Sequence, residues 1–155
     1  MKKISGVCIL LLILAVDIFA ADLSSASQVS SKSLLQLLDS DYSKYADIDD
    51  NGLLIIREDG IKLAVESDEQ LSFIEFFAVW KKRENISDNR LYKILNEWNK
   101  TEIFATVFTD NDFIVMKYFL RTTGGIKGTV FNGTISVLFY LANRLDHYLE
   151  SEDAI

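Results

Sequence analysis

Short apolar segments separated by polar turns make up residues 31–80. Four leucines at helical spacing predict a helix over residues 31–40: Leu34, Leu35, Leu37 and Leu38. The dipeptides Asn51-Gly52 and Asp59-Gly60 predict two hairpin turns, because both accept positive φ angles. Residues 61–65 alternate between apolar and more polar side chains, as a half-buried strand does. Residues 71–80 are apolar at nearly every position, which predicts a central strand buried on both faces.

The second half of the chain has the pattern of a helix, a hairpin and a second helix. Ser87 is a suitable N-cap for a helix whose apolar stripe has i, i+3, i+4 and i+7 spacing, formed by Leu91, Ile94, Leu95 and Trp98. Residues 103–109 and 113–121 predict two strands joined at residues 110–112. Gly124-Gly125 predicts a sharp turn before a last helix over residues 127–149. Trp98 shares its stripe with Leu91, so we expect it to be buried.

The order of these elements is α-βββ-α-ββ-α, which predicts an α+β fold with helices packed on one face of an antiparallel sheet. The expected divisions are a signal peptide at 1–20, a Ser-rich flexible lead at 21–30, one domain at 31–150 and a C-terminal tail at 151–155. The strand at residues 113–120 carries large apolar side chains on both faces. Because three helices cover one sheet face, we expect either its Phe113, Val115 and Phe119 face or the opposite one to remain exposed.

The first twenty residues have the layout of a secretory signal peptide. Lys2 and Lys3 precede an apolar run from Cys8 to Val16, and small residues at Ala20 and Ala21 suit cleavage. The run is much shorter than the ~20 residues of a membrane span, so a retained anchor is the weaker alternative. We therefore expect a periplasmic or secreted protein with no stable membrane insertion after cleavage.

Charge and composition exclude some classes of partner. The formal net charge is −7 with no basic stripe, which argues against nucleic acid as a partner. Cys8 is the only cysteine and lies in the signal segment, and His147 is the only histidine. With so few nucleophiles and bases, the sequence supports no catalytic triad, and we expect no catalytic residue and no cofactor.

The motifs of the second half resemble the YbjN domain family. They are Leu95-Asn96-Glu97-Trp98-Asn99 at the end of the middle helix, the strands at 104–110 and 113–120, and the Gly124-Gly125 pair before the final helix. Members of this family are described as bacterial sensory transduction regulators, and their fold is similar to that of type III secretion chaperones. The resemblance covers residues 31–150 and implies a small protein-binding domain that often pairs with itself. It implies no catalytic residues.

One segment matches the calcium loop of an EF-hand. Asp47, Asp49, Asn51, Gly52 and Glu58 fit the pattern D-x-[DN]-x-[DN]-G-x5-E, whose oxygens surround the ion. However, Asp59-Gly60 follows where a helix should continue, and residues 53–56 are strand-like. A hairpin is the favoured interpretation, and calcium binding stays open as the alternative.

The remaining polar candidates have structural explanations. We expect Asn96 and Asn99 to bond backbone groups at the helix end, and His147 to lie at the surface. Glu66, Asp68 and Glu69 are expected to form a solvated turn rather than a pair of glycosidase acids. Gly124, Gly125 and Gly128 precede a helix but lack the lysine of a phosphate loop. The favoured function is an exported, non-enzymatic protein-binding or chaperone-like module that binds a protein partner or itself. The alternatives are calcium binding through residues 47–58 and a small secreted enzyme.

Overall fold

The computed structural model of the chain describes residues 22–25, 28–68 and 70–155, so the predicted signal peptide lies outside the described residues. The first half contains β1 (Asp22–Leu23), α1 (Ser31–Leu37), α2 (Ser40–Ser43), β2 (Ala46–Ile48), β3 (Leu54–Glu58), β4 (Ile61–Asp68) and β5 (Phe73–Lys81). The second half contains α3 (Asp88–Thr101), β6 (Thr106–Asp110), β7 (Phe113–Arg121), β8 (Ile126–Lys127) and α4 (Gly128–Ser151).

The predicted α+β fold is confirmed. Six strands form one antiparallel sheet in the order β2-β3-β4-β5-β7-β6, and β1 pairs with β8 beside it. The turns at Asn51-Gly52 and Asp59-Gly60 are present, with φ of +83° at Gly52 and +84° at Gly60. The predicted first helix is divided, because the carboxylate of Asp39 caps a separate short helix, α2, by accepting from the backbone of Asp41 and Tyr42.

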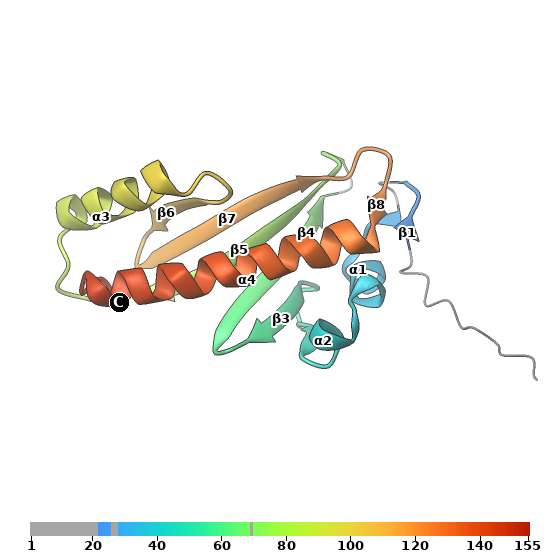
Figure 1. Ribbon diagram of the computed structural model, residues 1–155, viewed down its shortest axis with the longest axis horizontal. Helices are drawn as coiled ribbons and strands as arrows, with labels where there is room; N and C mark the ends of the chain where they lie inside the picture. Colours follow the sequence, from blue (N-terminus) through green and yellow to red (C-terminus); the bar gives the residue numbers. More distant parts are fainter. Residues whose placement is uncertain (1–21, 26–27, 69) are drawn as a thin grey trace, which may run out of the picture.

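The core lies between the helices and one face of the sheet. Figure 1 shows α4 running the length of the sheet, with α3 beside its C-terminal end and α1 near its N-terminal end. Buried side chains from alternate strand positions meet the helices there, among them Leu54, Leu63, Phe76, Ile114 and Met116. Trp98 is buried as expected, and its ring contacts that of Tyr148 on α4. We call this side of the sheet the inner face.

The prediction that residues 71–80 are buried on both faces is wrong. In β5 the residues alternate between fully buried and partly or largely exposed. Phe76 lies on the inner face, whereas its neighbour Phe77 lies on the opposite face and is only half-buried. The apolar run reflects two different surfaces rather than a doubly covered strand. Glu66 and Asp68, which were expected to form a solvated turn, instead lie on β4, because this strand continues to Asp68.

The two ends of the domain make ordered contacts. Asp22 and Leu23, from the segment expected to be a flexible lead, pair with Lys127 and Ile126. The Asp22 carboxylate accepts a hydrogen bond of 3.1 Å from the backbone N–H of Gly128, the first residue of α4. A negative side chain here offsets the positive end of the helix dipole. Ala154, in the predicted tail, is fully buried and its carbonyl accepts from the backbone N–H of Arg83.

Candidate functional site

The face of the sheet opposite the helices, which we call the outer face, retains a cluster of exposed apolar side chains. The exposed fractions are 51% for Phe119, 48% for Val79, 46% for Phe113 and 38% for Phe108. With the more buried members Phe73, Phe77 and Val115 they form what we call the apolar patch. The patch spans β5, β7 and β6, because these strands are neighbours in the sheet. The expectation of one exposed sheet face is therefore met by Phe113 and Phe119, while Val115 between them is only 9% exposed.

A charged pair lies within the apolar patch. Glu75 on β5 forms an ion pair with Lys117 on β7, and both side chains are mostly buried. The Lys117 ammonium also lies 5.9 Å from the centre of the Phe108 ring and 5.7 Å from that of Phe119. Cation–π contacts of this kind hold rings in place around a cation. The patch is thus an organised surface rather than a set of scattered apolar residues.

The patch continues into a hollow at one edge of the sheet. Strand β6 pairs with β7 only as far as Lys117, so residues 118–121 of β7 extend past it. The hollow has a volume of about 330 Å³ and is lined by residues of β6, β7 and the preceding loop: Phe104, Thr106, Phe108, Lys117, Tyr118 and Phe119. Phe104 stacks on Tyr118 with 4.4 Å between ring centres. Large apolar rings therefore line both the face and its edge.

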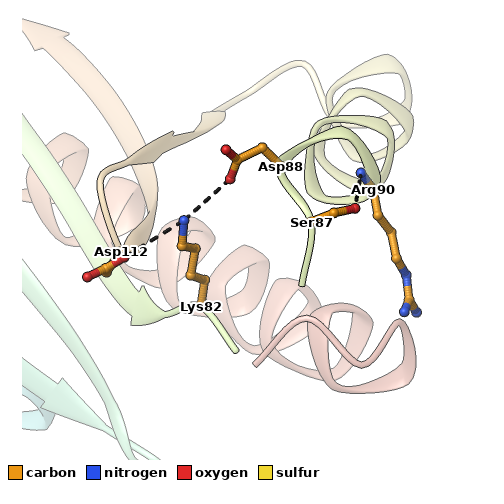
Figure 2. Close-up of polar contacts among 5 residues, drawn as sticks. All are labelled: Lys82, Ser87, Asp88, Arg90 and Asp112. Carbon is orange, nitrogen blue, oxygen red and sulfur yellow. Dashed lines mark hydrogen bonds and ion pairs between the residues drawn. The ribbon is translucent and has the colours of Figure 1, made fainter. Parts of the chain in front are cut away.

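A polar junction holds the end of the sheet from which Phe113 projects. Figure 2 shows Lys82, in the connection after β5, between Asp88 at the start of α3 and Asp112 in the β6–β7 turn. The Lys82 Nζ lies 3.4 Å from Asp88 Oδ1 and 3.8 Å from Asp112 Oδ1. The Lys82 backbone N–H also donates to the Asp112 carbonyl. Ser87 caps α3 as predicted, since its Oγ accepts from the Arg90 backbone. The turn beside Phe113 is thereby fixed to α3.

A larger cleft than this hollow lies elsewhere, between α2 and the turn that joins β3 to β4. Its volume is about 850 Å³, and Tyr42, Tyr45, Glu58 and Lys62 are among its lining residues. Burial raises the pKa of the Glu58 carboxyl, and the nearby carboxylates of Asp59 and Asp41 raise it further. Two cationic side chains of the cleft already have partners. Arg57 forms an ion pair with Asp47, and the Lys44 ammonium lies over the Tyr45 ring.

The EF-hand pattern forms a hairpin. Asp47 is paired with Ile55 across β2 and β3 and makes an ion pair with Arg57 on the outer face. Glu58 follows Arg57 along β3, so its side chain projects to the opposite side of the strand. The carboxylate of Asp49 accepts hydrogen bonds from the backbone N–H groups of Leu53 and Asn51, which lowers its pKa. The pattern's carboxylates therefore do not converge on one point.

The other polar residues singled out in the sequence have structural surroundings. Asn99 bonds both backbone groups of Val107, donating at 2.7 Å and accepting at 2.9 Å, as predicted, while Asn96 is exposed. His147 is largely exposed near Glu150. Glu66 and Asp68 lie on β4, and Glu69 lies outside the described residues. Gly125 must be glycine because a Cβ there would lie 1.9 Å from the Leu23 carbonyl oxygen.

One cluster on α4 combines two acidic residues with the histidine and belongs to none of the motifs described above. Asp146, His147 and Glu150 place one ligand atom each within 4.8 Å of one another. Asp146 already accepts a hydrogen bond of 2.7 Å from the Trp80 indole, and the other two residues are exposed. Helical spacing alone accounts for the cluster.

In the ranges that the structure describes, no helix combines the length and hydrophobicity that a membrane span requires.

Comparison with known proteins adds one similarity of fold. No family model matches the chain, and neither does any curated protein. Among solved structures, the chain is similar to YbjN from E. coli, a proposed transcription regulator. The identity is 18%, the alignment covers 61% of this chain and 78% of that chain, and the TM-score is 0.43. This match concerns the fold alone.

Proposed function

We propose that this chain is a non-enzymatic protein-binding module that is exported and binds its partner through the apolar patch of the outer face. The observation that carries the proposal is the clustering of Phe108, Phe113 and Phe119 with Val79 on three adjacent strands. Single exposed apolar residues are normal on soluble proteins, whereas a contiguous apolar area of several hundred Å² marks a contact site.

The composition of the patch suits a protein partner. Aromatic side chains are enriched where proteins meet, and they supply much of the binding energy when a partner excludes water around them. The Glu75–Lys117 pair offers polar groups at the centre of the patch, so a partner can be aligned as well as attracted. A chaperone-like or regulatory role would use the same surface.

The non-enzymatic part of the proposal rests on the arrangement of reactive groups. A hydrolytic site needs a nucleophile and a base within hydrogen-bond reach of each other. The exposed His147 is paired with Glu150 on one helix face, away from the cleft that contains Glu58. Burial and the neighbouring carboxylates of Asp59 and Asp41 account for the raised pKa of Glu58, so this shift by itself does not indicate a catalytic acid. A small secreted enzyme remains the alternative from a different class.

Site-specific photo-crosslinking in cells of the source organism tests the binding surface. A photoreactive phenylalanine at Phe119 should give a discrete adduct with a protein. The same group at Tyr140, an exposed ring on α4, should not. The Phe119 adduct should be lost when Phe113→Asp is introduced and kept with Val137→Asp, which places the same charge on α4. Equal labelling from both positions would contradict the proposal.

Export is tested separately by the mass of the mature protein. The basic start, the apolar run from Cys8 to Val16 and the small residues at Ala20 and Ala21 support it. Intact mass spectrometry of the protein recovered from its own cells should show loss of about 20 N-terminal residues. A full-length protein in the cytoplasmic fraction would contradict export and leave the binding face to be tested on its own.

A further inference from the structure

The outer face carries charges of both signs at fixed places along its strands. We infer that the occupant of the apolar patch is another molecule of this chain, packed face to face about a twofold axis that runs across the strands. The inference rests on the proposed function, since it requires the outer face to bind a protein. It adds the identity of the partner and its orientation.

The strand register fixes where each outward charge lies. The cross-strand row Ala64–Phe77–Lys117 runs through the middle of the outer face. Lys62 lies two residues from this row toward one end of the strands, beside Arg57 on β3. Glu66 lies two residues from it toward the other end. Along β4 the outer face is therefore basic on the Lys62 side of the middle row and acidic on the Glu66 side. We call these directions the basic end and the acidic end of the strands.

The same reasoning applies at the ends of the strands. Lys81 closes β5 at the basic end, and Asp68 closes β4 at the acidic end. On β6 and β7 the order is reversed. Asp110 lies at the basic end of the strands, and Arg121 lies at the acidic end. Each of these charges thus has a counterpart of opposite sign on the neighbouring strand. The two lie equally far from the middle row, toward opposite ends of the strands.

A twofold axis along the middle row exchanges the two ends of each strand while it keeps each strand over its own copy. Lys62 of one molecule then faces Glu66 of the other, and Lys81 approaches Asp68 of the other. Asp110 likewise approaches Arg121 of the other molecule. A twofold interface repeats each contact twice, so each of these pairs is formed in duplicate.

The apolar residues also match under this axis. Val115 and Phe119 lie two residues on either side of Lys117, so each faces the other across the interface. Phe113 and Arg121 lie four residues on either side, which places a guanidinium against an aromatic ring. Face-to-face packing of two sheets in this way buries apolar side chains at a separation of about 10 Å between sheets.

The charges nearest the axis are balanced within each molecule. Lys117 lies on the middle row, so it meets its own copy, and Glu75 faces Val79 of the other molecule. Both would be unfavourable as isolated ions, but Lys117 and Glu75 already form an ion pair with each other. Two such pairs at the centre of the interface carry no net charge, so they do not oppose association.

An axis parallel to the strands gives a poorer match. With β5 at its centre, such an axis would place β4 over β7 of the other molecule, since both flank β5. Lys62 would then face Val115, and Glu66 would face Phe119. Each charge would lose water without gaining a partner, which is unfavourable for a buried ion. The charge pattern therefore selects the axis that runs across the strands.

The charge pairing gives a direct test by equilibrium sedimentation of the purified mature domain. Lys62→Glu alone and Glu66→Lys alone should each weaken the dimer by about tenfold, because each places like charges opposite each other twice. An equimolar mixture of the two variants should form a heterodimer of near-normal affinity. The double variant should also dimerise normally. Both residues are exposed, so the fold should tolerate these changes.

Matched controls change the same charges away from the outer face. Lys93→Glu on α3 and Glu84→Lys in the β5–α3 connection alter the net charge equally and should leave the dimer intact. Phe119→Asp should abolish the dimer and Val137→Asp should not. If the dimer forms unchanged with Phe119→Asp and with the single variants Lys62→Glu and Glu66→Lys, it uses another surface. That result would overturn the inference.

The failure of this inference and that of the proposed function give different results. The protein could be monomeric at all concentrations while the crosslink at Phe119 captures a different protein. That result would contradict the inferred dimer and support the outer face as the binding surface. If the crosslink at Phe119 joins two copies of the chain, both are supported. If no dimer forms and no adduct arises at Phe119, both are contradicted.

Discussion

The inner and outer faces of the sheet are built from the same strands and from similar residues, yet only one is covered. Phe76 and Phe77 are neighbours on β5, as are Phe113 and Ile114 on β7. Phe76 packs against Phe131 of α4, with 5.8 Å between ring centres. Phe119, on the outer face, meets Phe73 edge to face at 5.1 Å and stays half exposed. The inner face is the core of the domain, and the outer face has the composition of a core without a covering element.

This difference separates two reasons for an apolar residue to be present. On the inner face, apolar side chains stabilise the fold by leaving water when the chain folds. On the outer face the same side chains remain partly in water after folding, so they contribute less to the stability of the fold. The largest difference between the faces should therefore appear in the free energy of unfolding.

Truncation of one phenylalanine on each face measures that difference. Phe76→Ala should lower the free energy of unfolding by about 3–5 kcal/mol, because the side chain is 1% exposed and its removal leaves a cavity. Phe119→Ala should cost about 1 kcal/mol or less, mainly its contact with Phe73. Urea denaturation at a concentration where the protein is monomeric gives both values. Equal losses would show that the outer face is part of the core.

The second prediction concerns a polar contact that supports the edge of both faces. Asn99 holds Val107 of β6 through two hydrogen bonds, so Asn99→Ala leaves both backbone groups without that partner. The free energy of unfolding should fall by about 1–3 kcal/mol. Asn96→Ala is the matched control on the same helix, and as an exposed position it should change stability by less than about 0.5 kcal/mol. If the two variants were equal, the β6 edge would not depend on Asn99.

Local pattern and tertiary pairing contribute differently to what the sequence can predict. The strand at 113–121 and the cap at Ser87 are predictable because they depend on alternation and on one side chain near its own helix. The pairing of β1 with β8 is not, since strands of two residues have no measurable period and the Asp22–Gly128 contact joins residues far apart in sequence. An apolar run such as that of β5 shows which residues avoid water, but not which face has a helix over it.

The candidate surface shows the same division. Alternation along β7 is enough to predict that Phe113, Val115 and Phe119 share one face, and the limited number of helices implies that one face stays open. The Glu75–Lys117 pair and the charge order across the outer face are not predictable in this way, because both depend on the register between strands. The EF-hand pattern is limited for the same reason: it specifies spacing, whereas the β-register decides which way each carboxylate points.

The third prediction uses two acidic residues of that pattern, whose pKa values shift in opposite directions. Burial raises the pKa of Glu58, so its contribution to stability is fully present below its ordinary value of 4.5 and is lost as the pH rises through the raised value. Backbone hydrogen bonds from Leu53 and Asn51 lower the pKa of Asp49. Its contribution is therefore present above 3.8 and is lost as the pH falls through the lowered value.

Thermal unfolding across the acidic range separates the two carboxyls. Glu58→Gln should equal the unmodified protein at low pH and become slightly more stable near neutral pH. Asp49→Asn should be less stable near neutral pH, and this deficit should shrink as the pH falls. Both effects should be smaller than that of Asn99→Ala. Parallel curves for the two variants would contradict the opposite environments of these residues.

The smallest expected effect is that of calcium, and it follows from the separation of the two faces. Asp47 is directed to the outer face, where it pairs with Arg57, and Glu58 is directed to the inner side near Asp41. One ion cannot take both carboxylates without disrupting the β2–β3 pairing, so calcium should leave the melting temperature unchanged. Binding at a hundredfold excess over Kd would instead add about 2.7 kcal/mol. A calcium-dependent rise in melting temperature that is lost in Glu58→Gln but kept in Glu66→Gln, which removes a carboxylate outside the pattern, would show that residues 47–58 rearrange into a metal site.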